Sequence, residues 1–420
     1  MKDCIKIILT EISYSLLSIF HALILLLGMA TTTFAQEPID CQSCHGDKAL
    51  VVADSAGVER SLFVDVEKMA NSIHAGFDCV TCHADIKEIP HAEPLAPAAC
   101  QTCHEVAATE LTESVHGKAS DGDAPACGNC HGSHEIRAAA DSLALVHPRQ
   151  LAFTCGHCHA NPALVEKHKI PIKDPLRAYT HSIHGRLALA GVDSAATCSS
   201  CHGSHKILAA NNAESKAFHF NVPQTCGQCH QQIADEFVQS VHGVAVARGS
   251  TDAPVCTDCH SEHAIESSSV ATAPTSPQNV ATETCGRCHA STRLTEKYGM
   301  RRERVSTFAD SYHGLALRSG RLSVANCGSC HGIHNILPSN DSRSMIHPAN
   351  LANTCGQCHP NAGENFAASP VHLTPEEREG KAVAIIRFLY ITLIVVVIGG
   401  MVIHNALDFV RKNKHALRRE

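Results

Sequence analysis

Two long apolar segments lie near the ends of the chain, and the stretch between them is largely polar. The first, Ser15–Ala30, follows two lysines and leads into small residues up to Ala35. A basic start, an apolar centre and a small-residue end are typical of a secretory signal peptide. We therefore predict that residues 1–35 are a cleavable signal, with an uncleaved anchor as the alternative.

The second apolar segment, Ala382–Ile403, contains 22 residues, which as a helix would measure about 33 Å. This length covers the hydrocarbon layer of a bilayer, so residues 382–410 are predicted to form a transmembrane helix. The tail at 411–420 is basic, whereas acidic residues precede the helix. Because basic residues favour the cytoplasmic side, we expect the tail in the cytoplasm. The body at 36–381 is then expected in the periplasm or an equivalent extracytoplasmic space.

The body is rich in cysteine and histidine. The chain contains 23 Cys and 31 His but no Trp and only five Tyr, so a core of large aromatic side chains is not expected. The pentapeptide Cys-x-x-Cys-His occurs eleven times, and it uses every cysteine after the predicted signal. The cysteine pairs are Cys41 and Cys44, Cys79 and Cys82, Cys100 and Cys103, Cys127 and Cys130, Cys155 and Cys158, Cys198 and Cys201, Cys226 and Cys229, Cys256 and Cys259, Cys285 and Cys288, Cys327 and Cys330, and Cys355 and Cys358.

This spacing is the attachment motif of c-type haem. The two thiols add to the two haem vinyl groups, and the histidine that follows them is placed under the iron as its proximal ligand. A single copy would also fit a zinc ribbon or a disulfide scaffold, but neither repeats one fixed pentapeptide eleven times. The predicted proximal ligands are His45, His83, His104, His131, His159, His202, His230, His260, His289, His331 and His359.

The motifs belong to a longer repeat. One unit contains Ser-x-His-Gly, then a motif usually followed by x-x-His, then, after about 24 residues, Thr-Cys-Gly-x-Cys-His. The chain is thus predicted to hold a lone haem and five two-haem modules. The lone haem lies in 36–70, and the modules are 71–110, 111–175, 176–235, 236–300 and 301–381.

The repeat also suggests a second, distal histidine for each iron. Six histidines lie in Ser-x-His-like positions, four lie three residues after a proximal histidine, and one lies in the shortened first module. In that order they are His74, His116, His184, His242, His313 and, less closely, His372; His134, His205, His263 and His334; and His91.

A competing set precedes the second motif of three modules: His147, His219 and His347. The fourth module has no histidine at that position, and this absence favours the first set. His157, His168 and His181 are interpreted as solvated residues or as contacts of haem propionates. Two imidazoles on every iron would leave no vacant position, which suits electron transfer better than substrate chemistry.

Eleven haems between Gln36 and Lys381 leave too few residues per haem for a conventional hydrophobic core. We therefore expect haems that pack on one another and a mostly α-helical fold with extensive coil. The body would be an elongated haem-packed cytochrome with almost no sheet, followed by the single C-terminal transmembrane helix.

The chain resembles the multihaem c-type cytochromes with doubled Cys-x-x-Cys-His motifs. The resemblance rests on Ser114 to Gly117, on Cys127 to His134 and on Thr154 to His159, which recur across nearly the whole body. It implies bis-His haems in closely stacked pairs that carry electrons in anaerobic respiration. The first module departs from the pattern, so His91 is the least secure distal ligand.

The formal net charge is −7, and the body is more acidic than this because the C-terminal segment is basic. Such a surface does not suit nucleic acid and favours redox partners with basic patches. We expect a carrier without enzyme activity, anchored in the cytoplasmic membrane, that links a quinone-linked or b-type cytochrome subunit to a periplasmic or extracellular acceptor. The alternatives are a reductase of nitrite, hydroxylamine or a sulfur oxyanion with one open iron, and a conductive filament.

His404 lies near the cytoplasmic end of the predicted transmembrane helix. An ionisable residue at this depth has two interpretations. It is either an interfacial residue near the head groups or, together with a partner subunit, a ligand of b-type haem or a contact of quinone.

Overall fold

The computed structural model describes residues 40–53, 57, 59–91, 95–119, 122–368, 371–374 and 381–416. The predicted signal peptide and residues 417–420 lie outside the described residues. The chain divides into two compact units. The first consists of Met1–Ala70 and His74–Ala99, and the second of Asn71–Ile73 and Cys100–Glu420. The predicted first module, 71–110, is thus divided between the two.

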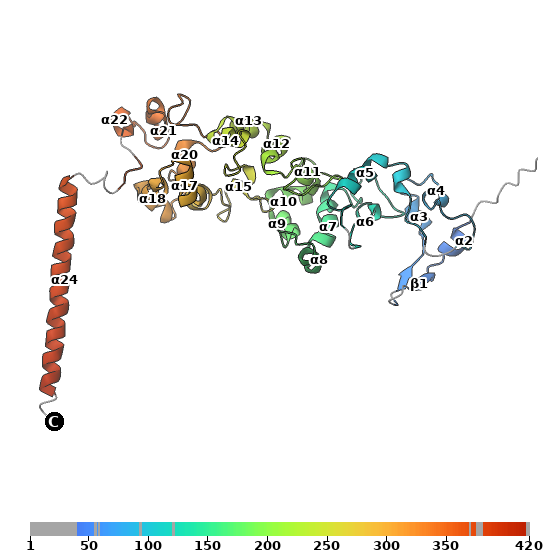
Figure 1. Cartoon of the computed structure of the whole chain (residues 1–420), viewed down its shortest axis with the longest axis horizontal. Helices are drawn as coiled ribbons and strands as arrows, with labels where there is room; N and C mark the ends of the chain where they lie inside the picture. The colour runs from blue at the N-terminus through green and yellow to red at the C-terminus, as the bar shows by residue number, and fades with distance from the viewer. Residues whose placement is uncertain are drawn as a thin grey trace, which may run out of the picture. The chain divides into compact units, whose positions relative to one another are not determined.

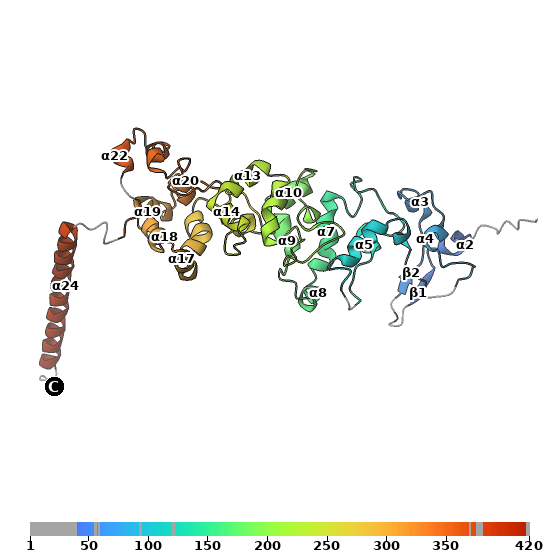
Figure 2. The ribbon, with the colours of Figure 1, turned by 45° about the horizontal axis from the view of Figure 1, so that its top comes forward.

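In its described residues, the first unit combines three short helices with one hairpin. The strands β1 (Val51–Ala53) and β2 (Glu59–Ser61) are antiparallel, with Val52 opposite Arg60, and all six residues are exposed (Figure 2). The helices are α2 (Gln42–His45), α3 (Val66–Met69) and α4 (Cys79–Cys82). Because the strands cover no core, they serve as a local turn rather than as a layer of the fold.

The second unit is built from short helices joined by irregular segments (Figure 1). Its α-helices are α5 (Glu105–Glu113), α6 (Cys127–His131), α7 (Pro148–His159), α8 (Pro162–Lys167), α9 (Pro175–His181), α10 (Ile183–Ala190), α11 (Cys198–His202), α12 (Val222–Gly227), α13 (Gln231–Gln239), α14 (Val241–Ala247), α15 (Cys256–His260), α16 (Gly286–His289), α17 (Thr292–Tyr298), α18 (Glu303–Ala309), α19 (Tyr312–Arg318), α20 (Cys327–His331), α21 (Leu351–Gly356) and α22 (Glu364–Ala367). The 3₁₀-helices are η1 (Cys100–Thr102), η2 (His219–Asn221) and η4 (Pro348–Asn350), and η3 (Val280–Cys285) is a π-helix.

The apolar cores of the second unit are small. One cluster contains Val222, Val246, Ala253 and Val255, and another contains Ala281, Phe308 and Leu317. Several of the most deeply buried side chains are serines rather than large hydrophobic residues: Ser114, Ser182, Ser240, Ser276 and Ser344. The expected predominance of helix with little sheet is confirmed, whereas haem packing and an elongated form stay predictions.

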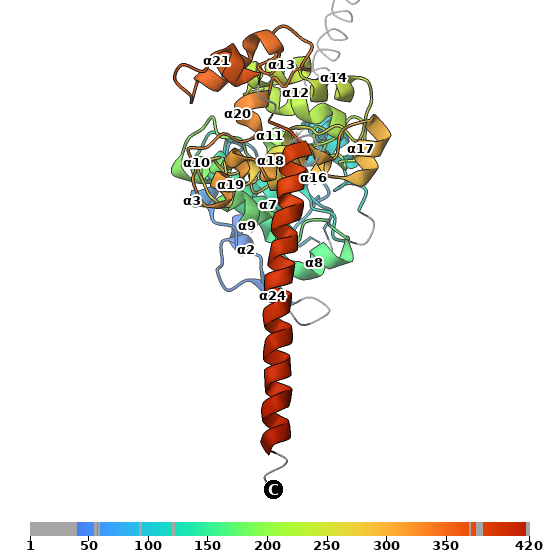
Figure 3. The same cartoon turned by 90° about the vertical axis from the view of Figure 1, so that its left-hand side faces the viewer.

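The C-terminal helix α24 (Lys381–Ala416) is a single unbroken helix (Figure 3). Its stretch Val383–Lys412, 30 residues, is long and apolar enough to cross a membrane, and its side chains are not buried against the rest of the chain. The helix continues past residue 410, so the predicted basic tail begins inside it. The first basic residues of the tail, Arg411 and Lys412, form ion pairs with Asp408 one turn earlier.

Candidate haem-binding sites

From the second module to the fifth, the first motif of each predicted module forms one helical turn. The same side-chain-to-backbone hydrogen bond closes each of these turns. The residue before the second cysteine accepts a hydrogen bond from the backbone N–H of the residue before the first cysteine. Asn129 accepts from Ala126 at 2.7 Å, and Asp258 accepts from Val255 at 2.8 Å. Ser200 and Ser329 accept in the same way at 3.0 and 3.1 Å. This bond is half of a capping box, and it keeps the two cysteines of the motif one turn apart.

From the second module to the fifth, the second motif begins with Thr-Cys-Gly, and the threonine and the glycine each have a structural role. The threonine hydroxyl donates to a carbonyl nine residues earlier, from Thr154 to Leu145 at 2.6 Å and from Thr354 to Met345 at 2.7 Å. The glycine allows close packing, because a Cβ atom at Gly156 would lie 2.5 Å from a Leu176 methyl group. The threonine therefore anchors the helix that carries the motif, and in the second module the glycine lets α9 approach it.

The Ser-x-His-Gly segments at Ser182, Ser240 and Ser311 are helix N-termini whose serine is the N-cap, and the segment at Ser114 is a turn in which the serine accepts the same hydrogen bond from the glycine N–H. The hydroxyl of Ser240 donates to the Phe237 carbonyl at 2.6 Å and accepts from the Gly243 N–H at 3.1 Å. A Cβ atom at Gly243 would lie only 2.1 Å from the Phe237 carbonyl oxygen. The corresponding distances at Gly117, Gly185 and Gly314 are 2.2, 1.9 and 2.2 Å. Serine and glycine are thus both required by the sharp turn that presents the histidine between them.

A backbone hydrogen bond ties four Ser-x-His turns, those at Ser72, Ser114, Ser182 and Ser240, to a later segment with the pattern His-x-Ile. The donor is the residue between serine and histidine, and the acceptor is the isoleucine carbonyl. The bonds are Ile73 N–H to Ile136, Val115 N–H to Ile207 and Ile183 N–H to Ile265, each at 2.8 Å, and Val241 N–H to Ile336 at 2.9 Å. We call these four bonds the isoleucine latches.

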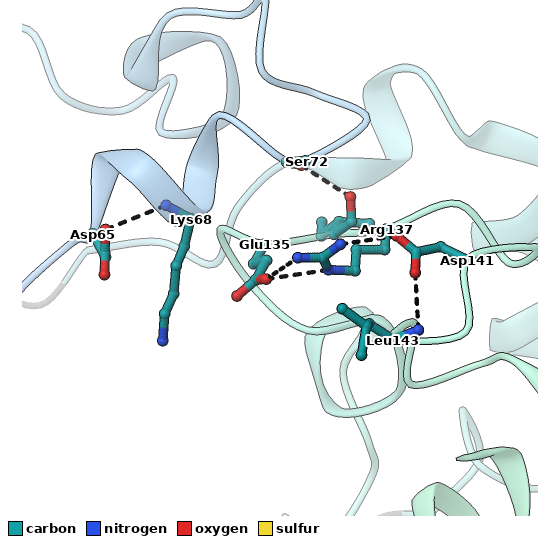
Figure 4. Close-up of polar contacts among 8 residues, drawn as sticks. Asp65, Lys68, Ser72, Glu135, Arg137, Asp141 and Leu143 are labelled. Atoms are coloured by element: carbon teal, nitrogen blue, oxygen red, sulfur yellow. Dashed lines mark hydrogen bonds and ion pairs between the residues drawn. The ribbon is translucent and has the colours of Figure 1, made fainter. Parts of the chain in front are cut away.

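Figure 4 shows the surroundings of the first isoleucine latch. The Ser72 hydroxyl also donates to the Ile136 carbonyl, at 3.1 Å. Next to it, Arg137 forms an ion pair with Asp141 at 2.8 Å and with Glu135 on its other side (Figure 4). These contacts fix the segment that directly follows His134, one of the predicted distal ligands.

The predicted ligands lie opposite one another in nine pairs of imidazole rings. The ring centroids are 6.0 Å apart for His45 and His91, 6.0 Å for His116 and His159, 6.0 Å for His131 and His205, 6.2 Å for His184 and His230, 5.8 Å for His202 and His263, 6.2 Å for His242 and His289, 6.1 Å for His260 and His334, 6.0 Å for His313 and His359, and 6.2 Å for His331 and His372. Each pair joins one predicted proximal residue to one predicted distal residue. His74 and His134 hold the same positions in the repeat as these distal residues, and their predicted role rests on that register.

This separation suits a metal ion held between two imidazoles. A metal–nitrogen bond of about 2.0 Å on each side, plus the distance from nitrogen to ring centre, gives about 6 Å between centroids. No cluster of three or more His, Cys, Asp or Glu that could hold a metal ion is found in the described part of the chain. A haem iron needs only two protein ligands, because the porphyrin supplies the other four, so the paired rings fit this group.

The pairing follows a rule that links neighbouring modules. The histidine of a second motif faces the Ser-x-His residue of its own module, as in His159 with His116. The histidine of a first motif faces the x-x-His residue of the next module, as in His131 with His205. His45 faces His91, the substitute in the shortened module. Every interior first motif of the second unit therefore has a histidine of the following module opposite its own histidine, in the place predicted for the distal ligand.

Burial favours the neutral form of these imidazoles, which is the form that binds a metal. Burial, with a smaller contribution from His289, lowers the pKa of His242 to about 4. Burial and the neighbouring His263 likewise lower the pKa of His202. At His45 the Nδ1–H group donates to the Leu62 carbonyl at 2.7 Å, so Nε2 faces the metal position.

Cysteines of consecutive motifs also lie close together. The thiols of Cys41 and Cys79 interact directly, and so do those of Cys155 and Cys198, Cys226 and Cys256, and Cys285 and Cys327. Between these contacts, Cys130 lies near Cys155, Cys201 near Cys226, Cys259 near Cys288 and Cys330 near Cys355. From Cys127 to Cys358 the motifs thus form an unbroken series of neighbours. A hollow of about 460 Å³ borders Cys103 and His104 of the preceding motif together with His205.

The competing histidines have other contacts. His147 and His347 are N-caps whose Nδ1 atoms accept the backbone N–H groups of Arg149 and Ala349, each at 3.2 Å. His219 keeps its Nε2 atom buried with no hydrogen-bond partner among the described residues, so capping does not account for it.

The three remaining histidines lie away from the pairs. His168 contacts Asp123 at 2.9 Å, and His181 donates to the Arg177 carbonyl at 2.8 Å. His157 is exposed. None of the three faces a proximal histidine in the ring pairs above.

Sequence reasoning missed the isoleucines of the latches and Thr307, whose hydroxyl lies 3.2 Å from His372 Nδ1. The recurring His-x-Ile pattern was a visible signal for the isoleucines, whereas Thr307 follows no repeat. Compared with protein-family models, with curated proteins and with solved structures, the chain gives no match.

Proposed function

We propose that this chain is a membrane-anchored multihaem c-type cytochrome that carries electrons along eleven covalently bound haems. The observation that carries the proposal is the set of nine imidazole pairs, each 5.8 to 6.2 Å apart and each containing one histidine of a Cys-x-x-Cys-His motif. A zinc or disulfide scaffold gives no reason for histidines to face each other in this way.

Electron transfer suits this arrangement better than catalysis. Two imidazoles complete the coordination of an iron, so a substrate finds no vacant position. The iron supplies one-electron chemistry when haem is bound, and the protein fixes its two axial ligands and its distance from the next site. The series of neighbouring motifs from Cys127 to Cys358 supports transfer from site to site.

The proposed location is the cytoplasmic membrane, with the haem-binding body on the outer side and α24 as a single crossing. A c-type attachment motif in a chain with a signal-like start supports this orientation, as does the basic end of α24. The proposed partners are a quinone-linked or b-type cytochrome membrane subunit and a periplasmic or extracellular acceptor with a basic docking surface.

The deciding experiment combines the mass of the intact mature protein with its ferric electron paramagnetic resonance spectrum. We expect a mass that corresponds to eleven haems added to a chain starting near Gln36, with low-spin bis-imidazole signals. A haem number other than eleven would refute the proposal. A stoichiometric high-spin signal that takes up cyanide or nitrite would instead support the reductase with one open iron.

A further inference from the structure

His372 is a histidine whose place in the structure differs from its place in the repeat. Its sequence, Ser-Pro-Val-His, resembles the Ser-x-His segments that serve second motifs. In the structure it faces His331, the proximal residue of a first motif, with the ring centroids 6.2 Å apart. In the preceding module the equivalent position, opposite His260, is filled by His334 of the next module. His372 thus takes, opposite His331, the place that a histidine of the next module takes opposite His260.

The ring angle supports this interpretation. The pairs His131 with His205, His202 with His263 and His260 with His334 have nearly parallel rings, at 26°, 10° and 20°. His331 and His372 are inclined at 47°, close to the 47° to 67° of the pairs that use Ser-x-His residues. A segment of Ser-x-His type therefore occupies a position that a different segment fills in the interior modules.

Thr307 orients the His372 ring. Thr307 lies on α18 and is only 5% exposed. Its hydroxyl donates to the Glu303 carbonyl at 2.7 Å, so the oxygen can accept a hydrogen bond from His372 Nδ1, 3.2 Å away. With the proton on Nδ1, the lone pair of Nε2 is directed at the metal position. The contact with Thr307 therefore gives the His372 ring one defined orientation.

The segment that carries His372 leads directly into the membrane helix. Eight residues lie between His372 and Lys381, the first residue of α24, so the two Cα atoms are at most about 32 Å apart. The last module is also less covered than the interior ones. Tyr312 is 76% exposed, whereas Val115 and Val241 at the same position of their turns are 43% and 37% exposed.

We propose that His372 is a terminal distal ligand supplied by the membrane linker, and that the haem on Cys327 and Cys330 is where electrons pass between the haem series and an integral membrane redox partner. This inference rests on the proposed function and adds to it the site of exchange. The short linker keeps this haem within reach of a partner in the bilayer, whichever way electrons flow.

The ligand role is tested with His372→Gly in the full-length protein. We expect eleven haems, one new high-spin ferric signal per chain, binding of one equivalent of cyanide, and return of the low-spin signal when imidazole is added. His347→Asn is the matched control, because it removes a histidine of the same module but keeps an N-cap, and it should leave all signals low-spin. Eleven haems without a new high-spin signal in His372→Gly would overturn the ligand role, whereas a wild-type haem number other than eleven would refute the proposed function itself.

The site of exchange is tested with His372→Met and His91→Met in native membrane vesicles. Methionine ligation raises the potential of one haem in each variant. We expect His372→Met to slow electron exchange between the quinone pool and the other haems at least tenfold, the effect of a 59 mV step for one electron. His91→Met, which alters a haem of the first unit, should slow this exchange less than His372→Met does. Equal effects, a larger effect of His91→Met, or no exchange even in the wild type would overturn the proposal. Thr307→Val removes the acceptor of the His372 Nδ1–H group and so makes the imidazole less basic; it should raise the midpoint potential of the same single haem.

Discussion

Ser240 gives the sharpest test of how the chain presents a distal ligand. Its side chain is fully buried, and its hydroxyl makes two hydrogen bonds at the start of α14. Ser240→Ala removes the N-cap, which costs about 1 kcal/mol, and leaves the Gly243 N–H buried without an acceptor, which costs about another 1 kcal/mol. The turn that holds His242 opposite His289 should therefore open more often, by a factor of about 5 to 30.

The assay is the rate at which cyanide replaces a histidine in the oxidised protein. With Ser240→Ala we expect one haem in eleven to react about 5 to 30 times faster than in the wild type, with a lower thermal midpoint. Gly243→Ala should act in the same direction and more strongly, because its Cβ atom would lie 2.1 Å from a carbonyl oxygen. Ser319→Ala is the control, since Ser319 is exposed and its hydroxyl only donates to the Ala316 carbonyl. Cyanide rates within twofold of the wild type in both Ser240→Ala and Gly243→Ala would refute this account of the Ser-x-His-Gly turn.

Two further predictions concern stability. Ser261 has φ 71° and ψ 175°, a region that favours glycine, and glycine occupies the same position at Gly203. Ser261→Gly should therefore raise the free energy of unfolding by about 1 kcal/mol, measured as a higher thermal midpoint. A lower midpoint would contradict the assigned strain. Hydrogen bonds from Lys297 and Arg293 hold the pKa of Asp252 well below its usual range, so its stabilising effect is complete above the unfolded pKa near 3.9 and is lost as the pH falls below it. Asp252→Asn should thus lower the thermal midpoint at pH 7, the difference from the wild type should shrink at pH 3, and a difference that does not change with pH would argue against the ion pairs as its cause.

The sequence alone was enough to exclude some histidines and some pairings from the predicted ligand set. Both His147 and His347 are followed by proline, which is common in the first turn of a helix, so each could be recognised as an N-cap rather than a ligand. The spacing also excludes one simple pairing. His134 lies three residues after His131, and three residues span at most about 11 Å, too little to reach both faces of one iron.

Which module serves which iron could not be deduced from the spacing. The partner of His131 is His205, 74 residues later, and the bond that fixes this neighbourhood joins two backbone groups, Val115 N–H and the Ile207 carbonyl. The His-x-Ile pattern marks the acceptor segment, but a backbone hydrogen bond does not specify by side-chain identity which Ser-x-His turn that segment joins. The role of His372 was hidden for a related reason, because its sequence resembles one kind of segment while its partner belongs to the other kind.

The interlocking of the modules explains how a chain with such small apolar clusters could hold a defined structure. Within the second unit, each interior iron of a first motif would join two modules, since its two ligands come from different repeats. Each of these iron–imidazole bonds would then act as a cross-link between segments dozens of residues apart, in place of the hydrophobic contacts that a larger core provides. Metal binding of this sort contributes directly to folding free energy, because an unfolded chain cannot hold the two ligands together. The buried serines and the isoleucine latches would then need only to fix the local turns, so that each histidine faces the position proposed for its iron.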